Sequence, residues 1–220
     1  MTSTATQPTL MRKDQIDDSA AVLARAFFDD PMMRWIMPDD AKRLKDFPWF
    51  FHAAAVLGDR YGEVFTTGDT VAGNAVWLPP GGTTVTMGRM ARVGMLKAPF
   101  KLGFGPFMRF MKIMNTFEHL HDRDMPEAHW YLMLLGVDPP RQGQGVGGAL
   151  IQPILARADA DKLPCYLETQ KEINVPFYQR NGFEVIVEDD IPNKGPHYWT
   201  MKRAPQSDHR LKARPATEPV

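Results

Sequence analysis

The sequence contains few of the features that mark secreted, membrane-spanning or nucleic-acid-binding proteins. A single cysteine, Cys165, excludes an internal disulfide and a multi-cysteine zinc or iron–sulfur site. No run of about 18 apolar residues occurs, and Met1 to Leu10 lacks the basic and apolar regions of a secretion signal. Lys+Arg and Asp+Glu balance at 26 each, so no overall charge attracts nucleic acid or an anionic membrane. We therefore expect a cytoplasmic protein with no nucleic-acid and no membrane partner.

The remaining composition is that of an ordinary globular domain. Hydrophobic residues make up 44% of the 220 residues and charged residues 24%, which is enough apolar surface to build a core. No repeat with a period of 20 to 50 residues is present. After Arg203 the chain becomes rich in Pro, Ser, Lys and Arg. We expect one domain over residues 1–203 and a flexible tail over 204–220.

The hydrophobic pattern changes from helical spacing to strand-like runs along the chain. Two helices over 14–28 and about 40–59 precede a predicted hairpin, whose strands 63–67 and 70–78 meet at Gly68-Asp69 in a type I′ turn. Strands and helices then alternate, which indicates an α/β or α+β fold with a mixed sheet. The other predicted elements are strands at 9–13, 129–137, 165–169, 183–188 and 197–202, and helices at 149–158 and 175–181.

A glycine-rich turn separates the predicted central strand from the helix that follows it. The segment Gln142 to Gly148 holds four glycines, so its backbone N–H groups can converge at the positive end of a helix dipole. That geometry binds phosphate groups. The alternative is a glycine-rich turn with no ligand.

A dinucleotide-binding interpretation of the same turn is disfavoured. Gly143, Gly145 and Gly148 match G-x-G-x-x-G, and Glu168 follows at a suitable spacing. However, residues 138–142 separate the strand from the first glycine, whereas the dinucleotide fingerprint places that glycine directly after the strand. A P-loop is excluded because no Gly-Lys-Ser or Gly-Lys-Thr occurs.

Four motifs in fixed order resemble the GNAT superfamily of acetyl-CoA-dependent N-acetyltransferases. They are Val137-x-Pro139, Gln142-x-x-Gly145-x-Gly147, Leu167-Glu168-Thr169 and Asn174-x-x-Phe177-Tyr178-x-x-x-Gly182-Phe183. Further blocks, such as the closing Gly195-Pro196-x-x-Trp199-x-Met201, are similar to the puromycin N-acetyltransferase subgroup. The resemblance implies a single-domain GNAT-like fold with a mixed, mostly antiparallel twisted sheet flanked by helices.

The resemblance also implies where acetyl-CoA would bind. The edge of the strand at Leu135 and Val137 would pair with the pantetheine arm, and Asn174 would bond the cofactor near the same arm. Tyr178 would stand close to the thioester sulfur. The coenzyme A diphosphate would be held by Gln142, Gly143, Gln144, Gly145, Val146 and Gly147.

The chemistry of acetyl transfer needs an acid, a base and an oxyanion donor. Tyr178 is the candidate acid for the leaving thiolate, and an N–H of Leu135 or Gly136 is the candidate oxyanion donor. Glu168 is the first candidate for the base, with His129 and Asp30 as weaker ones. The alternatives stay open: Tyr178 as a packed aromatic, Asn174 as a helix N-cap, and Glu168 as a salt-bridged or capping residue. Cys165, in an apolar strand, is not expected to act as a nucleophile, so we expect direct transfer in a ternary complex without metal.

The acceptor side of the site is less clearly encoded. A basic amphipathic insert at 86–117 has no acidic residue and a stripe of Met and Phe. We expect this stripe to pack on the core and line the acceptor site; a dimer contact and a membrane contact are the alternatives. His119-x-His121-Asp122 is expected to be a solvated loop and not a metal site. The candidate acceptor-site residues are Phe27, Asp30, Trp35 and Trp77; for Phe27, Trp35 and Trp77 ordinary burial in the core is the favoured alternative.

We therefore predict an N-acetyltransferase that acts on a primary amine of a small molecule as a monomer or homodimer. Acetylation of a peptide is the first alternative, and it would need an open groove. The second is a non-catalytic acyl-CoA sensor or interaction module.

Overall fold

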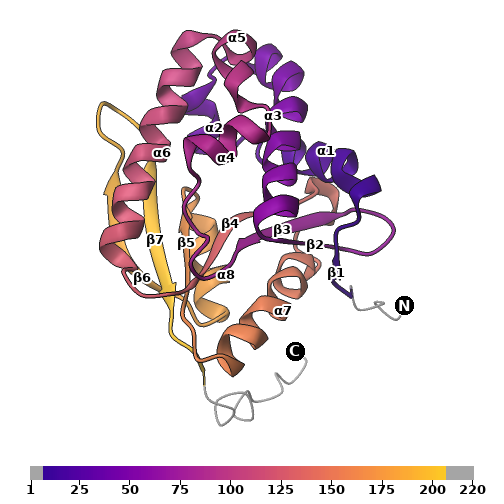
Figure 1. The fold of residues 1–220 in the computed structure, drawn as a ribbon, viewed down its shortest axis with the longest axis vertical. Coiled ribbons are helices and arrows are strands. Elements are labelled where there is room, and N and C mark those ends of the chain that lie inside the picture. Colours follow the sequence, from indigo (N-terminus) through magenta and orange to yellow (C-terminus); the bar gives the residue numbers. More distant parts are fainter. Residues whose placement is uncertain (1–6, 207–220) are drawn as a thin grey trace.

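One seven-stranded sheet organises the chain, in strand order β1-β2-β3-β4-β5-β7-β6 (Figure 1). The computed structural model describes residues 7–206. All neighbouring strands are antiparallel except β4 and β5, which are parallel. The predicted mixed, mostly antiparallel sheet is confirmed, and the parallel sheet of a dinucleotide-binding fold is excluded. The strands are β1 (Thr9–Leu10), β2 (Glu63–Thr66), β3 (Gly73–Leu78), β4 (Trp130–Val137), β5 (Cys165–Thr169), β6 (Glu184–Asp190) and β7 (His197–Arg203).

Three helices, not the two predicted, precede the hairpin. Asp30 caps α2 by accepting from the backbone N–H of Met32 (3.0 Å), and Asp39 caps α3 in the same way. Each capping aspartate therefore starts a new helix. The helices are α1 (Ile16–Ala26), α2 (Pro31–Ile36), α3 (Asp40–Tyr61), α4 (Met87–Arg92), α5 (Ala98–Leu102), α6 (Phe104–Asp124), α7 (Val146–Ala160) and α8 (Val175–Arg180). Short 3₁₀ turns cover Lys13–Gln15, Met95–Lys97, Pro139–Arg141 and Glu172–Asn174.

The hairpin of β2 and β3 forms, but its turn is not type I′. The loop covers residues 67–72, and of Gly68 and Asp69 only Gly68 has a positive φ (83°). A type I′ turn requires positive φ at both central residues. The Thr67 hydroxyl instead accepts from the N–H of Ala72 at 2.7 Å and donates to the carbonyl of Thr70 at 2.6 Å. This side chain closes the wider loop.

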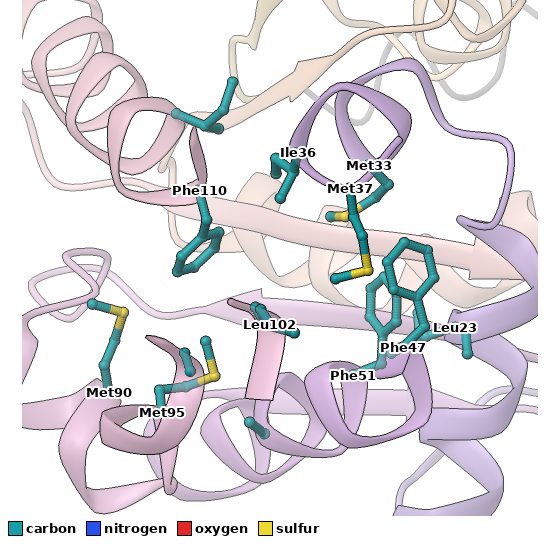
Figure 2. Packing of buried hydrophobic residues seen from close by; sticks show 14 of the residues in the cluster. Leu23, Met33, Ile36, Met37, Phe47, Phe51, Met90, Met95, Leu102 and Phe110 are labelled. Carbon is teal, nitrogen blue, oxygen red and sulfur yellow. The ribbon is translucent and has the colours of Figure 1, made fainter. Parts of the chain in front are cut away.

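Two apolar clusters cover different parts of the sheet. The methionine-rich cluster lies between the sheet and α1–α6 and includes buried Met33, Met37, Met90 and Met95. Figure 2 shows Met33 and Met37 near Phe47 and Phe51, with Met90, Met95 and Phe110 on the other side of the same cluster. The α7 cluster lies between the sheet and α7–α8 and includes Trp77, Leu150, Ile151, Ile154 and Tyr178. In Figure 1, α2–α6 gather above the sheet and α7 lies below it.

The predicted basic insert forms α4, α5 and the first turns of α6. Its apolar stripe enters the methionine-rich cluster, where Met90, Met95, Leu102, Phe110 and Ile113 are buried. The expected core packing is confirmed for these five residues, whereas Leu96, Phe100 and Phe104 of the same predicted stripe are exposed. His119 and His121 lie within α6, so the solvated loop predicted there is wrong.

The C-terminal end of the described chain remains attached to the fold. Arg203 donates to both carboxylate oxygens of Asp159 at 2.7 Å, and the backbone N–H of Gln206 also donates to Asp159 at 2.7 Å. Ordered contacts therefore continue past residue 203. Residues 207–220 of the predicted tail lie outside the described residues. Between residues 7 and 206, no helix is both long and apolar enough to cross a membrane.

Candidate active site

The two parallel strands at the centre of the sheet separate soon after they begin. β4 and β5 pair only at Trp130 with Cys165 and at Tyr131 with Tyr166. From Leu132 to Val137, β4 has no strand partner on that side among the described residues. Its free N–H and C=O groups form an internal edge to which an amide-bearing ligand can add as a strand.

The glycine-rich turn starts α7 at the end of β4. Gly143 and Gly145 have positive φ (74° and 79°), and Gly145 is the N-cap residue. No side chain caps the helix and no acidic residue lies in its first turn, so the first N–H groups are open. A Cβ added at Gly143 or Gly145 would meet nothing within 4 Å. The turn therefore has the open N–H groups and the room that a diphosphate requires.

Glutamine side chains hold this turn against the strand. The Gln142 side chain donates to the carbonyl of Val137, and that of Gln144 to the carbonyl of Pro140, each at 3.0 Å. A Cβ at Gly147 would lie 3.6 Å from the side chain of Val137 and 3.5 Å from that of Phe177. The predicted diphosphate turn, the free edge of β4 and α8 are therefore contiguous.

A cavity of about 210 Å³ opens beside this edge. One wall is apolar and comes from the methionine-rich cluster. Other lining residues are polar, and we call them the polar end; no lysine or arginine is among the lining residues. The apolar wall includes Phe27, Met32, Met33, Phe50, Met90, Met95, Phe110, Met114 and Phe117, and the polar end includes Asp30, Glu118, His121, Asp122, Tyr131, Glu168, Asn174 and Tyr178.

Glu168 is the carboxylate best placed at the polar end. It lies on β5, and its Oε2 accepts from the hydroxyl of Tyr131 at 2.8 Å. Its Oε1 is buried and has no hydrogen-bond partner. Burial raises the pKa of Glu168 to about 8. Among residues 7–206 Glu168 forms neither a salt bridge nor a helix cap, so neither structural alternative predicted for it is seen there.

Tyr178 lies on α8 at the border between the cavity and the α7 cluster. Only 6% of the residue is exposed, and it packs on Phe177 and Phe183. Burial, and secondarily the charge of Asp30, raises the pKa of its phenol. The hydroxyl is therefore a neutral O–H donor at the cavity. The ring packs as the packed-aromatic alternative expects, but the hydroxyl is free to act on a ligand.

Asn174 occupies the N-cap position of α8, but its side chain makes no capping bond. The amide instead donates to the hydroxyl of Thr169 at 3.2 Å. Asn174 also lines the cavity. Because the capping alternative predicted for the side chain is excluded, its amide remains available to a ligand.

The predicted acceptor-site residues separate into two groups. Phe27 and Asp30 line the cavity, as does Leu135. Trp35 does not line it but packs against the outside of the methionine-rich cluster, with Lys112 6.0 Å from its ring. Trp77 is fully buried in the α7 cluster, because the alternation of β3 turns it to the opposite face of the sheet. Trp35 and Trp77 therefore do not line the cavity, and their packing agrees with the core role that was the alternative for them.

The sequence analysis missed Tyr131 and His121, which both line the cavity near Glu168. His121 and His129 face each other through Nε2, and His129 Nδ1 lies 2.6 Å from the carbonyl of Glu127. Because a carbonyl only accepts, His129 carries its proton on Nδ1, and His121 donates through Nε2. Burial lowers the pKa of His121 to about 4, so it is neutral. The period-two pattern of β4 was the only sequence feature that could have indicated Tyr131.

The remaining base and nucleophile candidates have structural partners. Asp30 caps α2, and burial raises its pKa. His129 is buried against His121. Burial raises the pKa of the Cys165 thiol to about 12, which leaves it unreactive. Within residues 7–206 no group of three or more His, Cys, Asp or Glu is placed to hold a metal ion.

Comparisons with known proteins agree with this geometry. The family described as "Acetyltransferase (GNAT) domain" matches residues 110–185. A relative named "Uncharacterized N-acetyltransferase C550.08", from Schizosaccharomyces pombe, is 31% identical over 175 residues, which cover 75% of this chain and 69% of the relative.

Two crystal structures share the fold. One is described as histone acetyltransferase HPA2 and related acetyltransferase from Corynebacterium glutamicum; it has a TM-score of 0.65 at 19% identity and covers 91% of this chain and 97% of its own. The other is arylalkylamine N-acetyltransferase 2 from Aedes aegypti, with a TM-score of 0.57 at 14% identity and coverage of 91% and 99%. At these identities the likeness concerns the fold.

Proposed function

This chain belongs to the GNAT acetyltransferase family, and on that premise we propose that it transfers an acetyl group from acetyl-CoA to a primary amine of a small, apolar molecule. The observation that carries the proposal is the continuity of three features. The open N-terminus of α7 leads along the free edge of β4 to a cavity where Glu168 and Tyr178 face the same space.

The donor side of the proposal uses backbone groups. The first N–H groups of α7 would bind the diphosphate of coenzyme A, and the edge from Leu132 to Val137 would pair with the amides of its pantetheine arm. This places the thioester at the cavity end of β4, near Leu135. The amide of Asn174, which is not used as a cap, would bond the same arm.

The acceptor side favours an apolar amine without an anionic group. The methionine side chains of the wall adapt to varied apolar shapes, and the carboxylates at the polar end attract a cation. Since no lysine or arginine lines the cavity, a carboxylate or phosphate on the substrate would have no partner. The arylalkylamine for which the Aedes aegypti structure is named is an amine of this kind.

The reaction is a direct attack in a ternary complex. Glu168 accepts a proton from the substrate ammonium, directly or through water, and the neutral nitrogen attacks the thioester carbonyl. The tetrahedral oxyanion is stabilised by a backbone N–H of β4, either Leu135 or Gly136. As the C–S bond breaks, the hydroxyl of Tyr178 donates its proton to the thiolate, the nitrogen loses its second proton to water as the amide forms, and water returns a proton to Tyr178. Cys165 takes no part, since its thiol is buried and protonated.

A thiol-release assay tests the proposal. Purified protein is mixed with acetyl-CoA and a panel of arylalkylamines, polyamines, amino acids and peptides with free N-termini, and free coenzyme A is followed. We expect release with apolar monoamines and little with amino acids or peptides. Release only with peptides would favour peptide acetylation. Binding of acetyl-CoA in a calorimeter without release by any amine would favour the sensor alternative.

Several finer points stay predictions. None of the relatives described above is named as a puromycin N-acetyltransferase, so puromycin itself belongs in the amine panel as a direct test of that subgroup. A monomer or homodimer is expected, and light scattering distinguishes them. A cytoplasmic location fits the single reduced cysteine.

A further inference from the structure

One end of the molecule carries an apolar surface that the proposed reaction does not use. Figure 1 places α5 and the start of α6 at this end, far from β1 and α7. Leu96, Phe100 and Phe104 are 65%, 91% and 72% exposed. Met87 and Met108 extend the surface, so that five of the nine large exposed apolar side chains lie between residues 87 and 108. We call this set of five residues the tip surface.

The tip surface is surrounded by positive charge. No acidic residue occurs between residues 87 and 117, whereas six basic residues do. Three of them, Arg92, Lys97 and Lys101, are exposed and form no ion pair within residues 7–206. From α3, the Nζ of Lys42 lies 3.5 Å from the position of a Cβ on Gly103, at the junction of α5 and α6. Exposed apolar side chains among unpaired cations are typical of contacts with anionic lipid.

A narrow groove of about 90 Å³ lies directly beneath the tip surface. It is lined only by apolar side chains and so offers no hydrogen-bond partner to a peptide backbone, whereas an acyl chain needs none. Three of its lining residues also line the acceptor cavity, so the two spaces are neighbours. The three shared residues are Met90, Met95 and Phe110.

We infer that the tip surface docks on an anionic membrane, with Phe100 and Leu96 inserted among the lipids and Lys97 and Lys101 at the headgroups. A second copy of this chain is a poorer occupant, because a two-fold contact through the same surface would bring two patches of positive charge together. Docking would bring the acceptor cavity next to the bilayer, where apolar amines concentrate. The inference concerns binding to lipid and does not depend on the reaction.

Vesicle sedimentation of the full chain tests the inference. The probes are vesicles of phosphatidylcholine alone and of an equal mixture of phosphatidylcholine and phosphatidylglycerol, at low and high salt. We expect binding to the mixed vesicles only, weakened by salt. Lys97→Gln with Lys101→Gln should weaken it about 30-fold, as expected for two cations leaving an anionic surface. Phe100→Asp should abolish it.

Matched controls come from the opposite end of the molecule. Leu10 is 56% exposed on β1 and Lys13 is exposed nearby, so Leu10→Asp and Lys13→Gln repeat the same chemical changes outside the tip surface. They should leave vesicle binding unchanged. Thermal unfolding and coenzyme A binding of every variant show whether it is folded.

Three results would overturn the inference. The first is equal sedimentation with neutral and mixed vesicles. The second is vesicle binding that survives Phe100→Asp in a folded protein. The third is a dimer in light scattering that Phe100→Asp converts to a monomer, because the surface would then be covered by a second copy.

Discussion

The two apolar clusters differ in the side chains that build them. The α7 cluster is made of rigid side chains, and Trp77, Leu150, Ile151 and Ile154 are all fully buried. The methionine-rich cluster uses flexible methionines, and a cavity of about 210 Å³ opens beside it. The α7 cluster positions the turn and strand edge that would hold a ligand common to the whole family. The methionine-rich cluster lines the space for the acceptor, which differs between family members.

This contrast shows how one fold can hold backbone groups in fixed positions in one region and adapt its side chains to different ligands in another. A close-packed cluster loses stability when even one methylene is removed, so it holds backbone groups in one place. Methionine has more rotatable bonds and fills irregular spaces. The polar groups Glu168 and Tyr178 lie where the two regions meet, and substitutions in each region should have different consequences.

The largest expected effect is on kcat, and it concerns Glu168, which lies where the two clusters meet. Glu168→Gln removes the proposed base and should lower kcat about 10²- to 10⁴-fold. In the unmodified enzyme kcat should rise with pH through about 8, because the carboxylate is the active form and burial raises its pKa to about 8. Stopped-flow thiol release over pH measures both. An unchanged profile in Glu168→Gln would remove Glu168 as the base.

Glu168→Gln should also change how the free energy of unfolding depends on pH. Because the pKa of Glu168 is higher in the folded state than its ordinary 4.5, the folded protein binds the proton more tightly. The free energy of unfolding therefore contains a contribution that falls as pH rises from about 4.5 to about 8. In Glu168→Gln this decrease should be absent, so the variant should be more stable than the unmodified protein above pH 8. Urea titrations at several pH values test this.

The next largest effect compares the two clusters directly. Ile154→Ala in the α7 cluster should lower the free energy of unfolding by about 2–5 kcal/mol, because a cavity opens in close packing. Met114→Ala at the cavity wall should cost about 1 kcal/mol or less, since Met114 is only partly buried. Urea denaturation of both variants gives the comparison. Equal losses would contradict the proposed difference in packing.

Tyr178→Phe tests the acid with a smaller expected effect. Removing one O–H donor should lower kcat about 10²-fold, while the ring keeps its packing on Phe177 and Phe183. The affinity for coenzyme A should stay the same, as measured by calorimetry. A thiol with a pKa near about 8.5 is a fair leaving group, so activity should fall without disappearing. Unaltered kcat would exclude Tyr178 as the acid.

The smallest effect concerns the turn before α7. Gly145→Ala places a side chain at a φ of 79° and should weaken coenzyme A binding about tenfold through strain at the N–H groups. Gly148→Ala is the matched control, because a Cβ there meets nothing within 4 Å and its φ is not positive. Calorimetry with coenzyme A compares the two. If both variants bind equally well, the conformation of Gly145 is not needed for the ligand.

The elements whose sequences carry local patterns were predicted well. The strand at 165–169 was predicted with its observed bounds, and the helix at 175–181 ends as expected before Gly182, whose φ is 89°. Both elements depend on local features, an apolar run and a glycine stop. The prediction of a type I′ turn at Gly68-Asp69 was wrong because the side chain of Thr67 closes a longer loop, and no dipeptide pattern shows this.

The residues of the candidate site show the same difference between local sequence patterns and long-range contacts. Glu168, Asn174 and Tyr178 were found from sequence motifs that resemble those of the GNAT superfamily, and all three line the cavity. Tyr131 was missed because it reaches Glu168 only across the pairing of β4 with β5, and His121 because it reaches Tyr131 only through the packing of α6 against the sheet. Trp77 was misplaced because composition does not show to which side of the sheet a residue of β3 points.

The sequence by itself determined the strand at 165–169, the glycine-rich start of α7 and the order of the motifs, because each depends on residues close together in the chain. Only the tertiary structure decided that β4 and β5 separate after two residue pairs, and that methionines from α2, α4, α6 and the 3₁₀ turn Met95–Lys97 line the cavity. These features depend on contacts between segments distant in sequence, and the burial they produce is also what raises the pKa of Glu168.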